Sequence, residues 1–166
     1  ETYNVIGNVN EYGLAISETT WGGVADLQHQ SKGIIDYGNL IYIALQRCKT
    51  AREAINLMTT LVATYGYASE GESFSLADPK EVWVLELIGK GEYELGAVWV
   101  ARRVPDGYVT AHANQARIRQ FPLNDPENCM YSTDVISFAK KHGFCSPSIR
   151  DEDFSFAAAY APLTFS

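Results

Sequence analysis

The first forty residues alternate short apolar runs with turn and glycine signals. Residues 5–9 and 14–19 predict two strands joined by a tight turn at 10–13. Asn10 and Gly13 favour this turn because Asn and Gly adopt the unusual backbone angles that tight turns require. The glycine-rich stretch 21–33 predicts a loop in which the backbone approaches another group closely. The chain therefore opens with a hairpin and an irregular segment.

Two helices are predicted next, from apolar positions that recur at helical spacing. Asp36 is a candidate N-cap for the first helix, and its apolar positions are Leu40, Ile41, Ala44 and Leu45. Thr50 and Glu53 have the spacing of a capping box at the start of the second helix. Gly66 is the predicted stop of that helix, and one apolar stripe runs along it: Ala54, Ile55, Met58, Leu61, Val62 and Tyr65.

After the helices the apolar period changes to two. This pattern predicts strands over 72–77, 82–88, 97–102 and 108–113, connected by short turn sequences that imply an antiparallel meander. A last helix is predicted from Ser132 or Thr133, as cap, to His142, with Gly143 ending it. Helices and strands segregated in this way predict an α+β fold with helices packed on one face of an antiparallel sheet.

Composition narrows the classes of function. The 166 residues suffice for a single domain, 1–166, with a real core. The net charge of −7 argues against nucleic-acid partners, because phosphate binding needs a basic face. No stretch has the length of a membrane span, and the cellular compartment stays open. Cys48, Cys129 and Cys145 are neither a disulfide framework nor a zinc signature, although Cys129 and Cys145 flank one helix and could bridge in an oxidising compartment.

Candidate chemistry is sparse when the residues are taken alone. The three histidines are far apart in sequence, so their spacing predicts no metal site. Asn114 lies at the end of a predicted strand, where a polar amide more often satisfies a local turn than binds a ligand. The segment Trp21-Gly22-Gly23 follows the first hairpin, and a surface loop is again the simpler interpretation.

The order of several segments changes these odds. The hairpin of residues 10–17 resembles the Asn-Glu-x-Gly-Leu hairpin of hydrolases with an N-terminal cysteine, a group that includes penicillin V acylases and bile salt hydrolases. The whole chain is most similar to the dipeptidase family of the N-terminal-nucleophile (Ntn) hydrolases, to which the secernins also belong. The segments that carry this likeness are 37–40, 50–55, 65–75, 86–91, 98–107 and 112–115.

The resemblance implies a partial Ntn αββα sandwich and the hydrolysis of dipeptides. In this family an N-terminal Cys attacks the scissile carbonyl and its own α-amino group is the base, with no metal or organic cofactor. Asn114 matches the asparagine whose side-chain amide donates to the oxyanion. Thr20 lies within about one residue of the position that supplies a backbone N–H as second donor. Trp21, Gly22 and Gly23 are then expected to line the substrate cleft.

The chain also departs from the family pattern. It carries no N-terminal Cys, and none of its three cysteines has a free α-amine. We therefore expect it to be a fragment of a larger dipeptidase domain, inactive alone, that needs the remainder of the same protein. An opened sandwich would expose apolar sheet surface and could drive association with further copies. Two alternatives remain: a non-catalytic, secernin-like binding protein, and an Ntn amidase or acylase that acts on acylated amines.

Overall fold

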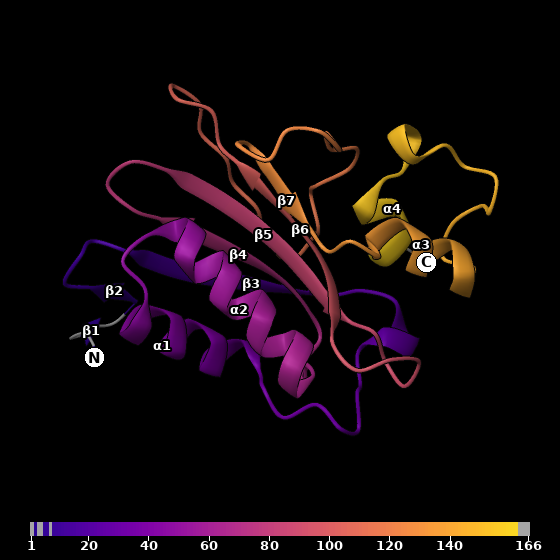
Figure 1. The fold of residues 1–166 in the computed structure, drawn as a ribbon, viewed down its shortest axis with the longest axis horizontal. Helices are drawn as coiled ribbons and strands as arrows, with labels where there is room; N and C mark the ends of the chain where they lie inside the picture. The colour runs from indigo at the N-terminus through magenta and orange to yellow at the C-terminus, as the bar shows by residue number, and fades with distance from the viewer. Residues whose placement is uncertain (1, 3–4, 7, 163–166) are drawn as a thin grey trace.

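The computed structural model describes residues 2, 5–6 and 8–162 as one antiparallel sheet with helices on both faces (Figure 1). The seven strands lie in sequence order, each antiparallel to the next. The strands are β1 (Val5–Ile6), β2 (Val9–Asn10), β3 (Ala15–Gly22), β4 (Gly71–Ala77), β5 (Val82–Gly89), β6 (Ala97–Arg103) and β7 (Cys129–Tyr131). The helices are α1 (Tyr37–Arg47), α2 (Ala51–Tyr65), α3 (Val135–His142) and α4 (Phe156–Tyr160), with single 3₁₀ turns η1 (Ala25–Leu27) and η2 (Asp151–Asp153).

The predicted α+β class and antiparallel sheet are confirmed. The two long helices, α1 and α2, lie side by side across one face of the sheet, which is the arrangement expected for part of an Ntn αββα sandwich (Figure 1). Both predicted caps are present: Asp36 Oδ1 accepts from Asn39 N at 2.7 Å, and Thr50 Oγ1 accepts from Glu53 N at 3.2 Å. The Glu53 carboxylate bonds the Lys49 N–H, one residue before the cap, instead of closing a complete capping box.

The hairpin motif near the start has a structural explanation. Asn10 is buried, and its Nδ2 donates to the carbonyl oxygens of Leu45 and Cys48 at 2.8 and 2.7 Å. Its Oδ1 accepts from the backbone N–H of Leu14 at 3.1 Å, so one side chain ties the turn to the end of α1. The predicted first strand is split into β1 and β2, and Gly7 within it lies outside the described residues, as do residues 163–166.

The predicted strand over 108–113 is wrong. The position beside β6 is taken by β7, with Val100 opposite Tyr131 and Arg102 opposite Cys129. Residues 108–113 form no strand, and Val109 is 97% exposed, so its apolar side chain marks no sheet face. The last helix is also shorter at its start than predicted: Asp134, not Ser132 or Thr133, is the N-cap residue of α3, while Gly143 ends the helix with a φ of +77° as expected.

Two apolar cores lie on opposite faces of the sheet. The first lies between the sheet and α1 and α2. The second joins Val84, Ile88, Val98 and Val100 of β5 and β6 to side chains from residues 118–160, including α3 and α4. The expectation of an exposed apolar sheet face is therefore wrong for β5 and β6, because later parts of the same chain cover them. No helix in the described part of the chain is long and apolar enough to cross a membrane.

Candidate functional site

The end of strand β3 forms one wall of the candidate site. A bulge in the β3–β4 register places Thr20 opposite Glu72 and Gly22 opposite Gly71, so Trp21 is the extra residue. The Trp21 ring packs against the backbone of Gly71, where a Cβ atom would lie 2.3 Å from the ring. Gly23 has a φ of +94°, and a Cβ there would lie 2.5 Å from Ile88 Cδ1. The glycines at 23 and 71 thus leave the space that the indole occupies.

Asn114 is held against this wall by its side-chain amide. Its Nδ2 donates to the backbone carbonyl oxygen of Thr20 at 2.6 Å, although the two residues are 94 positions apart in sequence. Asn114 is the one described non-glycine residue with a positive φ, +48°, a conformation that Asn tolerates better than most residues. An amide NH₂ group has two hydrogens. The bond to Thr20 uses one and orients the other as a donor for a ligand.

The segment that carries Asn114 is hydrogen-bonded to the sheet at two positions through His112. His112 lies on β3 and β4, with Nδ1 2.7 Å from Thr19 Oγ1 and Nε2 2.8 Å from Ser75 Oγ. Burial and the nearby Arg117 charge lower the pKa of His112, so the ring is neutral at pH 7. A neutral imidazole donates through one nitrogen and accepts through the other. These two hydrogen bonds hold the segment against β3 and β4. His112 itself is not part of a strand.

A buried carboxylate fixes the same segment farther along. Glu86 of β5 has no exposed surface, and it accepts from the backbone N–H groups of Arg117 and Ile118 at 2.5 and 3.0 Å. Ser73 Oγ lies 3.5 Å from the same carboxylate. Burial raises the pKa of Glu86, and the two backbone N–H donors oppose that rise. The carboxylate is thus a structural acceptor for residues 117 and 118, three and four positions after Asn114.

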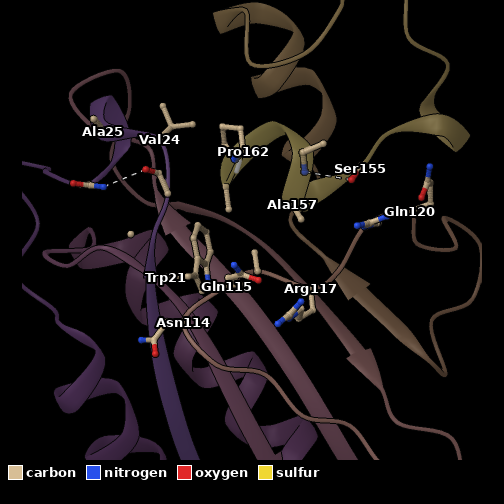
Figure 2. Close-up of a pocket in the computed structure, with 17 residues that line it drawn as sticks. Trp21, Val24, Ala25, Asn114, Gln115, Arg117, Gln120, Ser155, Ala157 and Pro162 are labelled. Carbon is tan, nitrogen blue, oxygen red and sulfur yellow. Dashed lines mark hydrogen bonds between the residues drawn. The ribbon is translucent and has the colours of Figure 1, made fainter. Parts of the chain in front are cut away.

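These elements border an open cavity of about 1240 Å³. Figure 2 shows Gln115 between Trp21 and Arg117, with Ser155, Ala157 and Pro162 above them near α4. Of the residues predicted from the sequence, Trp21, Gly22, Gly23 and Asn114 line the cavity. Thr20 does not line the cavity, but its backbone carbonyl oxygen accepts the hydrogen bond that orients Asn114. Asn114 and the Trp21–Gly23 segment are thus brought together.

The hydroxyl of Thr20 points to the opposite face of the sheet. Thr20 Oγ1 donates to Glu72 Oε1 at 2.8 Å. Glu72 has no exposed surface, and burial is the main cause that raises its pKa from 4.5 to about 8, with the neighbouring Glu18 and Glu70 carboxylates adding to the rise. At neutral pH this carboxyl group is therefore largely protonated. The Thr20 hydroxyl therefore contacts a buried acid, Glu72, on the face of the sheet opposite the cavity.

The Glu72 pKa predicts a specific dependence of stability on pH. The folded protein keeps a proton that the unfolded chain releases near pH 4.5, so this contribution to stability is complete below pH 4.5 and is lost as the pH rises to about 8. One proton corresponds to at most about 1.4 kcal/mol per pH unit. The full-length Glu72→Gln variant should lose this slope in denaturant melts between pH 5 and 8.

Glu11→Gln is the matched control, because Glu11 is exposed and distant in the hairpin turn. This variant should keep the wild-type slope. Equal slopes for the wild type and Glu72→Gln would show that Glu72 titrates normally in the folded protein.

The cysteines and the metal-ligating side chains of the described residues form no further site. Cys48, Cys129 and Cys145 are free, and burial raises the pKa of Cys48 and of Cys129 to about 11, so neither is an activated thiol. Within residues 2, 5–6 and 8–162, no group of three or more His, Cys, Asp or Glu side chains is arranged to hold a metal ion.

Sequence reasoning missed Glu86 and the two arginines that line the cavity, Arg117 and Arg119. Glu86 did carry a signal, since it is the one charged residue inside the apolar strand 82–89. A carboxylate is expected in such a strand only where donors reach it. The arginines carried no comparable signal, because an Arg-x-Arg pair in a loop is usual on protein surfaces.

Comparison with known proteins identifies the family of this chain. The family described as Peptidase family C69 matches residues 1–166, and the chain belongs to this family. Its relatives are therefore peptidases, which are a class of hydrolases.

Three curated relatives show the extent of the likeness. The chain is 32% identical over 145 residues to a "Probable dipeptidase" of Salmonella dublin, which covers 86% of the chain and 32% of that protein. It is 30% identical over 140 residues to a "Probable dipeptidase" of Latilactobacillus sakei (78% and 27%). It is 29% identical over 157 residues to "Probable dipeptidase B" of Streptococcus pyogenes serotype M1 (92% and 30%). The chain thus spans less than a third of the length of these relatives.

Proposed function

We propose that this chain is part of a cysteine-type dipeptidase and supplies the oxyanion-binding wall and the substrate cleft. The observation that carries the proposal is the Asn114 amide, which Thr20 orients at the edge of a large cavity. Membership of peptidase family C69 and the names of the relatives support the reaction class. The whole protein, on this proposal, hydrolyses the peptide bond of a dipeptide.

The nucleophile in this proposal is an N-terminal Cys in the remainder of the protein. Its α-amino group titrates near neutral pH, so it takes the thiol proton without a separate histidine. The thiolate attacks the scissile carbonyl carbon, and the carbonyl π electrons move to the oxygen. The free N–H of Asn114 donates to this oxyanion, together with a backbone N–H at the Thr20–Trp21 bulge. The amine leaves with a proton, and water hydrolyses the thioester. No metal or organic cofactor takes part.

The test is a substrate panel with the full-length protein. We expect release of free amino acids from dipeptides and little hydrolysis of N-acyl amides. The isolated 166 residues should cleave neither. Selective hydrolysis of acyl amides would instead identify an acylase, and dipeptide binding without hydrolysis would identify a non-catalytic binding protein. Activity of the isolated chain would contradict the assignment of the nucleophile to the remainder of the protein.

A further inference from the structure

Two arginines in the cavity have no ion-pair partner among the described residues, unlike arginines elsewhere in the chain. Arg52 pairs with Glu81 and Arg150 with Asp153, as expected in a chain with a net charge of −7. Arg117 and Arg119 both line the cavity, and within the described part of the chain neither guanidinium forms an ion pair or a side-chain hydrogen bond. The charge of Arg117 acts on Glu86, but the carboxylate of Glu86 already accepts from two backbone N–H groups.

The backbone around these arginines is fixed on both sides. Ile118 lies between them, is 8% exposed and belongs to the second core, while the residues at 117 and 119 are exposed. The carbonyl oxygens of Ile118 and Arg119 accept from Ala157 N at 2.9 Å and Phe156 N at 3.2 Å. This alternation directs the two guanidinium groups to the side of the cavity. A pair of unpaired cations on anchored backbone is an arrangement suited to an anion.

We infer that Arg117 and Arg119 bind the free C-terminal carboxylate of a dipeptide substrate. This inference rests on the proposed function. In a dipeptide three bonds separate the scissile carbonyl carbon from the carboxylate carbon, so the two lie within about 4 Å of each other. An anion site must therefore lie beside the oxyanion donor. Arg117 follows Asn114 by three residues, at most about 11 Å of extended chain, and lines the same cavity.

This placement also selects the C-terminal peptide bond, which in a dipeptide is the one peptide bond present. Arginine binds carboxylates through two parallel N–H···O bonds, which fix both position and orientation. In a tripeptide the carboxylate lies one residue, about 3.8 Å, farther from the first carbonyl carbon. A tripeptide held by its carboxylate at the arginines therefore presents its last peptide bond at Asn114, and its first peptide bond is not cleaved. The two arginines therefore restrict the amine product that leaves to a single amino acid.

The experiment compares a dipeptide with its C-terminal amide in the full-length protein. The wild type should prefer the free acid by about 10- to 100-fold in kcat/KM, the range expected for charge-assisted hydrogen bonds. The Arg117→Gln/Arg119→Gln double variant should raise KM for the dipeptide by a similar factor with kcat little changed, and it should lose the preference over the amide. Arg47→Gln, an exposed arginine on α1, is the matched control and should keep the preference.

Two outcomes separate this inference from the proposed function. If Asn114→Ala lowers kcat while the double-arginine variant still prefers the free acid as the wild type does, the carboxylate site is refuted and the dipeptidase assignment stands. If the full-length wild type cleaves no dipeptide, the proposed function itself fails. The melting temperatures of the variants must match that of the wild type within a few degrees. If the double variant does not fold, the single variants Arg117→Gln and Arg119→Gln replace it.

Discussion

Replacing Asn114 with Asp in the full-length protein is expected to lower kcat by about 10²- to 10³-fold. Loss of one oxyanion donor typically costs this much, because the negative charge on the oxygen develops only during the reaction. KM should change little, since the donor acts mainly on the transition state. Asp removes both amide hydrogens while keeping the size of the side chain. Steady-state kinetics with a dipeptide measure the effect.

Asp is chosen as the replacement because it tolerates the backbone conformation at position 114. Asn114 has a φ of +48°, which Asp tolerates and which strains Ala. Asn114→Ala should therefore show the same loss of kcat together with a lower melting temperature. A control at Gln115, which lines the same cavity, should retain kcat within about threefold when changed to Ala. An Asn114→Asp variant with wild-type kcat would remove Asn114 from the reaction.

Replacing Glu86 with Ala should produce the largest loss of stability among the site variants. The backbone N–H group of Arg117, whose hydrogen bond is partly buried, and that of Ile118, whose hydrogen bond is buried, would lose their acceptor. Each unsatisfied group costs about 1–3 kcal/mol, so a total near 2–6 kcal/mol is expected. Denaturant unfolding of the full-length protein measures this change. Because the same segment carries Asn114, kcat should also fall in protein that remains folded.

Two further variants show which contact matters. Glu86→Gln keeps one acceptor oxygen and should give an intermediate loss of stability. Ser73→Ala removes only the long 3.5 Å contact to the same carboxylate and should change stability by less than about 1 kcal/mol. A Glu86→Ala protein as stable as the wild type would mean that water or a shifted segment replaces the carboxylate, and that Glu86 does not position residues 114–118.

Local signals in the sequence were sufficient for the elements that depend on neighbouring residues. Helix α2 begins after Thr50 and ends before Gly66 as predicted, because both the cap and the stop are contacts within a few residues. Strands β4, β5 and β6 were also found, since their short turns keep sequence neighbours adjacent in the sheet. The predicted strand at 108–113 failed because alternation alone cannot show that β7 occupies the position beside β6.

The candidate site depends on contacts that local patterns do not contain. Asn114 and Thr20 are joined across 94 positions, and Glu86 reaches Ile118 across 32. The family resemblance predicts Asn114 and the Trp21–Gly23 segment as site residues, and the fold places them on one cavity. Arg117 and Arg119 gain significance only when the fold places them on a cavity where no described carboxylate pairs with them.

The most direct test of the account is a crystal structure of the full-length protein with an uncleaved dipeptide, in a variant in which the proposed N-terminal Cys nucleophile is replaced. The account predicts that the scissile carbonyl oxygen faces Asn114 Nδ2, so that the oxyanion formed during the reaction comes within hydrogen-bonding distance of this amide. The dipeptide carboxylate should face Arg117 and Arg119 in the cavity beside Trp21. A dipeptide bound elsewhere, or with its scissile oxygen directed away from Asn114, would contradict the assignment of this cavity as the active-site cleft.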